Sequence, residues 1–391
     1  MSGKASSLSY QYVAPELRVF HGEQSLGGLK RELERNKCQR AVVVCGRTVS
    51  RSGALMSLRA TLGPLVAGVT ASAREHSPVS AIEETARFLK ESEADAIIAI
   101  GGGSAAVTAR AAAIFLGEQK PLAEICTRRL ADGQFESPRL NAPKLAQFVI
   151  PTTPSTAFVK AGTAVHDESG QRLALFDPKT RAKAIFIHPD FVRTAPAELA
   201  QTATLNAFAN AVEALESPKC DPFSEALLVH ALRLIRANVH LLGTDDVDAR
   251  ERLVVAAILC GRGTEQGGAA LASVLAHAIG KRSHVANGVV NAIVLPHTMR
   301  YNASVTQHRS ATIVDALIDQ SSSVDGSATA SAAVEKFLGR LATPRSLREI
   351  GIVREDLGGI ADAAMADWFI GRNPRAVPNV NTLVELLEAA W

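Results

Sequence analysis

The feature that most constrains the fold of this chain is a short apolar run that passes directly into a glycine turn and then into an alanine-rich segment. Residues 96–100 read AIIAI, and residues 105–116 are rich in alanine. Between them stand Gly101, Gly102, Gly103 and Ser104. A continuous apolar run bounded by a turn is typical of a strand buried on both faces, and a helix directly after it is typical of a parallel α/β sheet.

The glycine turn suits contact with a phosphate group. Without Cβ atoms, the backbone amides at the start of the following helix can approach a phosphate closely. The pattern is neither GxGxxG nor a Walker loop, and a tight connecting turn is the alternative interpretation. A second turn after the apolar residues 148–151 contains Thr152 and Thr153. Their hydroxyls can donate to a phosphate or ribose, or only stabilise their own loop.

The chain changes character near residue 193. Before it, apolar runs at residues 41–45 and 184–187 alternate with helical patterns. This alternation predicts a Rossmann-like parallel-sheet domain over residues 1–192. After it, helical patterns follow one another without a convincing strand, which predicts an all-helical domain over residues 193–391. The fold class is thus α/β plus all-α, and the cleft between the domains is the expected ligand site.

One predicted helix, LAQTATLNAFANAVEAL, carries two carboxamides in apolar surroundings. Asn206 and Asn210 are four residues apart, so their side chains lie on one face of the helix. Ser273 and His277 repeat this spacing on a second helix, and Asn287 follows in a predicted loop. If the two helices face each other, these residues line one cleft with few charges. The alternatives are a helix-to-helix hydrogen bond for the asparagines and a structural role in a helix crossing for His277.

Charge and cysteine content narrow the classes of protein. The net charge is +3, and no long basic run is interleaved with aromatics, which argues against nucleic-acid binding. The five cysteines are scattered without a CxxC motif, which fits reduced thiols in a cytoplasmic protein. No uninterrupted apolar stretch reaches the roughly 18 residues of a membrane span. The expected partner is therefore a small molecule, with neither nucleic acid nor membrane.

The order of these motifs resembles the iron-containing alcohol dehydrogenase superfamily. GGGS and PTT each follow a strand, and the block LAHAIG…NGVVNAIVLPHTMRYN follows the helix with the paired asparagines. The resemblance covers nearly the whole chain, including the ending NPRAVPN…LVELLEAAW. It implies the dehydroquinate synthase-like fold of that family, with a nucleotide-binding α/β domain, a helical domain and the active site between them. It also implies NADH or NADPH as cofactor and a homodimer.

The chain departs from the family where the metal should be held. Metal-dependent members use one Asp and three His, and the matching positions are Asn206, Asn210, Ser273 and Asn287. Amides and hydroxyls are weak ligands for Fe²⁺ or Zn²⁺, so no metal is expected. Asn in place of the ligand Asp resembles the maleylacetate reductase branch, whose members use NADH or NADPH without needing a metal. That branch usually keeps histidines at the other three positions.

The nucleotide motifs also depart from the family pattern. GGGSxxDxxK becomes GGGSAAVTAR, with Val107 for the acid and Arg110 for the lysine, and GTGSE becomes STAFV at residues 155–159. Gly46 and Arg47 follow the apolar run where members favouring NAD often carry an acid. Arg47 can pair with the 2′-phosphate of NADP, and a surface arginine is the alternative. We therefore predict a remodelled NAD(P) site.

These features predict a metal-independent, NAD(P)H-dependent reductase of a small oxo acid or of a carbonyl or enone compound, similar to maleylacetate reductase. Asn206, Asn210 and Asn287 are expected to donate hydrogen bonds to the developing oxyanion. His277 is expected to deliver the proton, because an ordinary histidine pKa of about 6.5 suits neutral pH.

The predicted substrate contacts are Lys160, Ser273 and His284, with a solvated surface position as the alternative for Lys160. Two other hypotheses fit the sequence. One is a lyase, cyclase or oxidative decarboxylase built on the same scaffold, and the other is a non-catalytic binding protein.

Overall fold

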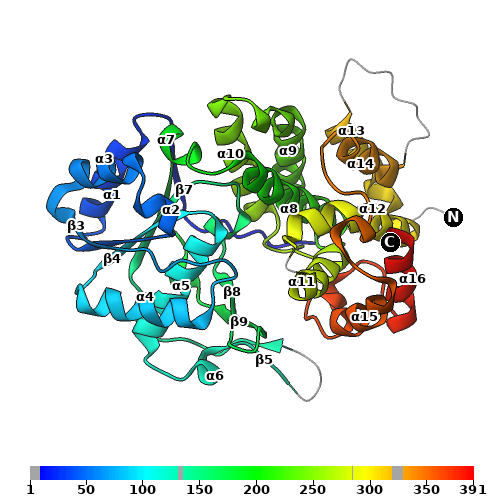
Figure 1. Cartoon of the computed structure of the whole chain (residues 1–391), viewed down its shortest axis with the longest axis horizontal. Coiled ribbons are helices and arrows are strands. Elements are labelled where there is room, and N and C mark those ends of the chain that lie inside the picture. The colour runs from blue at the N-terminus through cyan, green and yellow to red at the C-terminus, as the bar shows by residue number, and fades with distance from the viewer. Residues whose placement is uncertain (1–8, 131–134, 284, 319–328) are drawn as a thin grey trace.

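The computed structural model describes residues 9–130, 135–283, 285–318 and 329–391. Its N-terminal half is built on a parallel six-stranded sheet, drawn in blue to green in Figure 1. In spatial order the strands are β1 (Arg18–His21), β10 (Ala184–Ile187), β7 (Ala146–Pro151), β4 (Ala96–Gly101), β2 (Ala41–Cys45) and β3 (Val66–Thr70). Every pair of neighbouring strands is parallel.

Helices cover both faces of this sheet, and they bury central strands that are almost entirely apolar. Successive residues of β2 face opposite sides, so that Val43 packs with α1 (Ser25–Arg35) and α3 (Gly53–Leu62), while Val42 packs with α4 (Val79–Glu91) and α5 (Gly103–Glu118). The succession of strand, glycine turn and helix predicted around GGGS is therefore confirmed as β4 and α5. The remaining helices of this half are short: α2 (Arg47–Ser50), α6 (Leu122–Ile125) and α7 (Pro189–Val192).

Three smaller elements of the N-terminal half lie outside the six-stranded sheet. They are the hairpin of β8 (Gly162–His166) and β9 (Arg172–Phe176), the short pair β5 (Arg128–Arg129) and β6 (Phe135–Glu136), and the 3-10 turn η2 (Thr156–Val159).

Every regular element described after β10 is helical, which confirms the predicted fold class. The elements are α8 (Ala197–Glu216), α9 (Pro222–Asn238), α10 (Val247–Gly263), α11 (Leu271–Ser283), α12 (Asn287–Thr306), α13 (Ser310–Leu317), α14 (Ala330–Leu338), α15 (Leu357–Met365) and α16 (Val380–Ala390). The boundary predicted between residues 192 and 193 falls between α7 and α8. Among the described residues, Pro222–Gly243 has the length and composition of a membrane span. This stretch consists of α9 and the 3-10 turn that follows it, and α9 packs against α8 and α10.

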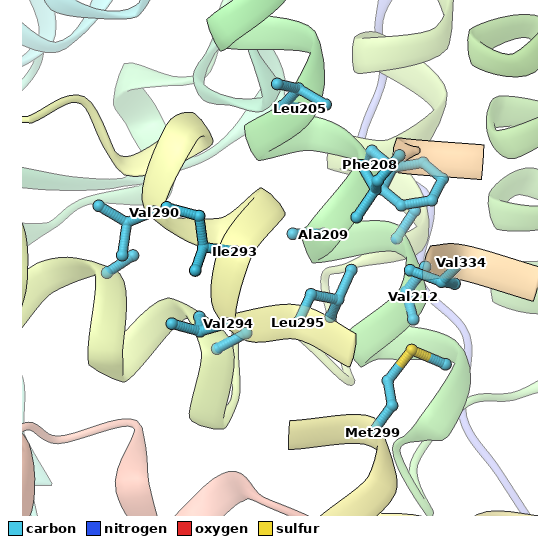
Figure 2. Close-up of a cluster of buried hydrophobic side chains, with 14 of the residues drawn as sticks. Leu205, Phe208, Ala209, Val212, Val290, Ile293, Val294, Leu295, Met299 and Val334 are labelled. Atoms are coloured by element: carbon cyan, nitrogen blue, oxygen red, sulfur yellow. The ribbon is translucent and has the colours of Figure 1, made fainter. Parts of the chain in front are cut away.

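The crossing of α8 and α12 forms the centre of the helical domain. Figure 2 shows Phe208 and Val212 of α8 beside Leu295 and Met299 of α12, in a cluster of buried apolar side chains. Farther along the crossing, a Cβ atom at Gly288 would lie 1.8 Å from the carbonyl oxygen of Thr202, so that only glycine fits.

Asn287 lies at the first position of α12 and not in the predicted loop. The glycine after it disfavours a helix when only local sequence is considered, but the close crossing with α8 requires that glycine.

The two halves share packed surface through α10. Val254 and Ile258 of α10 belong to the apolar cluster under the sheet. A Cβ atom at Gly261 would lie 2.5 Å from Val159 Cγ2, so the end of α10 lies directly against η2. This contact joins the N-terminal domain directly to the helical domain.

Candidate functional site

A cavity of about 610 Å³ lies between the two domains. The N-terminal domain contributes residues of η2, β8 and β9, and the helical domain contributes residues of α8, α11 and α12. The structure brings together most of the catalytic and substrate residues that the sequence singled out. Those lining the cavity are Lys160, Asn206, Asn210, Ser273, His277 and Asn287. His284 lies outside the described residues.

Asn206 and Asn210 of α8 both line the cavity, and Asn206 also joins α8 to α12. Asn206 Oδ1 accepts a hydrogen bond from Asn291 Nδ2 on α12 at 3.0 Å. Asn210 Nδ2 donates to the Asn206 carbonyl oxygen at 2.6 Å. The interhelical hydrogen bond considered from sequence is therefore present for Asn206, and Asn291, which lines the cavity one turn after Asn287, was not predicted. Within the described part of the chain, Asn206 Nδ2 donates to no protein group, so it is available as a donor.

Ser273 is tied to a buried carboxylate that the sequence analysis missed. Ser273 Oγ donates to Glu213 Oε2 at 2.6 Å, and its backbone N–H donates to Oε1 at 3.2 Å. Burial raises the pKa of Glu213 despite these hydrogen bonds. Because its hydroxyl proton is directed to Glu213, Ser273 can contact a substrate as a hydrogen-bond acceptor. The available signal was that Glu213 follows Asn206 by seven residues, which places both on one face of α8.

His277 is held by two charged neighbours. Its Nδ1 lies 2.9 Å from Asp367 Oδ2 and 3.3 Å from Arg172 Nη1. Burial and then the charge of Arg172 lower the pKa of His277 below its ordinary value, although Asp367 opposes the shift. The shift favours the neutral form of the imidazole. If its Nδ1–H donates to Asp367, Nε2 carries a lone pair and accepts protons. The argument that an ordinary pKa makes His277 the proton donor does not hold here.

A segment after α15 adds aromatic and cationic side chains to the cavity. Trp368, Phe369 and Arg372 line it, and the Arg172 guanidinium lies 4.9 Å from the Trp368 ring and 5.6 Å from the Phe369 ring. The Arg372 guanidinium lies 4.7 Å from the Phe369 ring. Such contacts fix a guanidinium while leaving its N–H edge accessible. The sequence ADWFIGRNPR lacks helical or strand periodicity, so no local pattern indicated this role.

Lys160 is a partly buried cation that lines the cavity between the domains. Its Nζ donates to Thr264 Oγ1 at 2.8 Å and lies 3.7 Å from Glu265 Oε1. The side chain is only 25% exposed, and burial lowers the pKa of Lys160 to about 8, with Glu265 acting in the opposite direction. A fully solvated surface lysine, the alternative considered from sequence, does not describe this position.

The charge of the cavity differs from the weakly charged cleft that the sequence predicted. The described lining includes four cationic side chains, Lys160, Arg172, Arg181 and Arg372, but one carboxylate, Glu265. Arg181 binds that carboxylate through two hydrogen bonds of 3.0 and 2.9 Å. The remaining positive charge favours an anionic ligand.

The residues predicted to bind the nucleotide lie outside this cavity, at the carboxyl ends of β2, β4 and β7. The start of α5 at Gly102–Ser104 has no side-chain cap, so its N–H groups can bind a phosphate. A Cβ atom at Gly102 would lie 2.6 Å from Thr153 Oγ1, so the glycine turn also packs closely against the turn that contains the buried Thr152 and Thr153. Gly46 precedes α2, and Arg47, its first residue, is exposed.

Arg110, which replaces the family lysine, is buried beneath η2. Its guanidinium donates to the carbonyl oxygens of Gly162 at 2.8 Å and Ala157 at 2.5 Å. Burial lowers the pKa of Arg110 to about 10. This residue therefore shapes the wall of the cavity through the backbone of η2.

The positions that match the family's metal ligands do not fit iron or zinc. They supply three carboxamides and one hydroxyl, whereas these metals prefer imidazole, carboxylate and thiolate. Within the described ranges, no three His, Cys, Asp or Glu side chains lie close enough together to hold a metal ion.

Comparisons with known proteins agree with this architecture. The iron-containing alcohol dehydrogenase model matches residues 15–189, and the model of the C-terminal part of the Fe-containing alcohol dehydrogenase family matches residues 200–391. Lactaldehyde reductase of Escherichia coli is 28% identical over 380 residues, covering 95% of this chain and 97% of the relative. Maleylacetate reductase of a Rhizobium species is 28% identical over 367 residues, covering 92% of each.

The solved structure of an alcohol dehydrogenase from Oenococcus oeni has the same fold, with a TM-score of 0.87 at 20% identity over 98% of this chain and 100% of that one. The chain belongs to the iron-containing alcohol dehydrogenase family and is an oxidoreductase.

Proposed function

We propose that this chain is a metal-independent, NAD(P)H-dependent reductase of a small oxo acid. The observation that carries the proposal is one interdomain cavity in which the family's ligand positions are neutral and the surrounding wall is cationic. A neutral amide cluster binds no catalytic metal tightly, and the cationic wall suits a carboxylate. The similarity to maleylacetate reductase supports an oxo acid as the substrate class.

The N–H groups at the start of α5 would hold the phosphates of the dinucleotide, and Arg47 would face the 2′-phosphate of NADP. Reduced nicotinamide supplies a hydride when it is bound. Arg372 is the candidate for the substrate carboxylate, because it forms no ion pair with any described side chain and its guanidinium is held against Phe369. Asn206 Nδ2 is the candidate donor to the developing oxyanion, a type of contact whose loss costs roughly 3 kcal/mol.

The test combines metal analysis, titration and turnover on the purified protein. We expect NADH or NADPH fluorescence to change on binding, and NAD(P)H to be consumed with maleylacetate or a similar oxo acid even after treatment with a chelator. A variant that restores the family's ligands, Asn206→Asp, Asn210→His, Ser273→His and Asn287→His, is the matched control that should take up zinc.

Two outcomes contradict the proposal in different ways. Stoichiometric iron or zinc in the wild type, with activity lost on chelation, refutes metal independence. Binding of the dinucleotide without turnover of any oxo acid favours the lyase, cyclase or decarboxylase hypothesis. The homodimer and the cytoplasmic location also remain proposals, and light scattering on the purified protein tests the first.

A further inference from the structure

Lys160 stands where the N-terminal domain contacts the helical domain. It directly follows η2, and its ammonium group reaches Thr264 at the end of the helical segment α10. The side chain lines the same cavity as Asn206 and Asn210. An ammonium group from one domain thus enters the space that the neutral residues of the other domain enclose.

The positive charge of Lys160 is not fully neutralised by its neighbour. Glu265 is bound at both carboxylate oxygens by Arg181, at 3.0 and 2.9 Å, whereas Lys160 Nζ lies 3.7 Å from Glu265. Among the described residues, the Lys160 ammonium makes one hydrogen bond within normal distance, to Thr264 Oγ1. An ammonium has three donors, so the remaining N–H groups can reach a ligand in the cavity.

Reduction of a carbonyl group needs a proton donor, and the surroundings of His277 disfavour its protonated form. Hydride addition leaves negative charge on oxygen, which must be stabilised and then protonated. Burial and then the charge of Arg172 lower the pKa of His277, although Asp367 opposes the shift. The guanidinium groups of the cavity do not release protons near neutrality.

We propose that Lys160 is the catalytic acid of this reductase, and that its ammonium group binds the substrate carbonyl oxygen and protonates the alkoxide. The role rests on the proposed reductase function. The carbonyl carbon gains the hydride, the electrons of the C=O π bond move to oxygen, and oxygen takes a proton from Lys160 Nζ. The neutral amine then regains a proton from water, so that the step consumes one hydride and one proton.

The acidity of Lys160 suits this chemistry. A pKa of about 8 keeps the group protonated at neutral pH while making its proton easier to release than that of a solvated lysine. The positive charge also compensates for the neutral groups at the metal-ligand positions, because it lies in the same cavity and is partly desolvated.

Two substitutions separate charge from proton transfer. Lys160→Arg keeps a cation that does not release its proton, and Lys160→Met removes the cation at similar length. We expect kcat for the oxo acid to fall about 100-fold or more in both variants, with KM changed much less. Lys183→Met, at an exposed position outside the cavity, is the matched control and should behave as wild type.

The pH dependence gives a readout that a structural role would not move. The wild-type kcat/KM profile should decline above about pH 8, following the pKa of Lys160. Glu265→Gln should shift this decline to lower pH, because the charge of Glu265 raises that pKa. Competitive acetylation with trace acetic anhydride across the pH range, read by mass spectrometry on the Lys160 peptide, measures the same pKa without turnover.

Each negative result has a separate meaning. A Lys160→Arg variant with near wild-type kcat, or acetylation that follows an ordinary lysine pKa, refutes the acid role while leaving the reductase intact. A borohydride-trapped oxo acid adduct on Lys160 also refutes it, because the amine would then be a nucleophile. A wild type without NAD(P)H oxidation refutes the proposed function and this role with it.

Discussion

Glu216 should make the helical domain less stable as the pH rises toward 7. It is the last residue of α8 and is 4% exposed. Its carboxylate accepts hydrogen bonds from Asn302 Nδ2 at 3.1 Å and Thr306 Oγ1 at 3.3 Å, and no described cation lies within ion-pair distance. Burial, helped by the charge of Glu213, raises the pKa of Glu216 from 4.5 to about 7.

The sign of the effect follows from which state releases its proton first. Below pH 4.5 both the folded and the unfolded chain keep the Glu216 proton. Between pH 4.5 and about 7 the unfolded chain loses it while the folded chain retains it, so the free energy of unfolding falls. The total loss is roughly 3 kcal/mol, a large part of a typical domain stability.

Glu216→Gln removes this titration while preserving the size of the side chain. Between pH 5 and pH 8.5 the variant should gain roughly 2 to 3 kcal/mol of stability relative to wild type. Urea unfolding followed by tryptophan fluorescence measures the difference, because both tryptophans, Trp368 and Trp391, belong to the helical domain. Glu385→Gln, at an exposed position on α16, is the control and should follow wild type at both pH values. Parallel pH dependence in wild type and Glu216→Gln would refute the argument.

Three other substitutions test the packing and the charges of the site. Gly288→Ala should lower the melting temperature by several degrees, because its Cβ would overlap the Thr202 carbonyl oxygen at 1.8 Å and overpacking costs about 1–3 kcal/mol; an unchanged melting curve would contradict the close crossing. Arg372→Met removes the proposed partner of the substrate carboxylate, so KM for the oxo acid should rise about tenfold or more with little change in kcat. Steady-state kinetics measures both constants, and an unchanged KM would exclude Arg372 as the carboxylate site. Asp367→Asn should lower the pKa of His277 further, because the Asp367 carboxylate raises that pKa in the wild type. An NMR titration in which the pKa of His277 rises in the variant would contradict the pairing of His277 with Asp367.

The fold could be predicted where the signal is local. The run at residues 96–100 became β4 because a strand buried on both faces needs apolar residues at every position, and the sequence shows that directly. Asn287 shows the limit of this approach. Local propensity places this residue in a loop, because a glycine follows it, whereas α12 in fact begins at Asn287. Glycine is needed at position 288 because the backbone of α12 lies directly against the backbone of α8 there.

Part of the candidate site could be predicted because motif spacing places polar residues on one helical face. Asn206 and Asn210 line the cavity together, as their spacing indicates. Asp367 could not be found in this way, since it meets His277 across 90 residues and lies in an irregular segment. The lowered pKa of Lys160 was equally hidden, because it comes from burial between two segments that are distant in the sequence, one of which includes Thr264, 104 residues later.

Residues 155–159, which depart from the family motif GTGSE, are held in place by hydrogen bonds and by packing. STAFV includes η2, whose carbonyl oxygens accept hydrogen bonds from two guanidinium groups, the buried Arg110 at Ala157 and the partly buried Arg181 at Val159. The end of α10 packs against the same turn at Gly261. These contacts fix the position from which Lys160 enters the cavity. The cation therefore depends on both domains, because Lys160 follows η2, donates to Thr264 of the helical domain, and has a pKa that burial lowers and Glu265 raises.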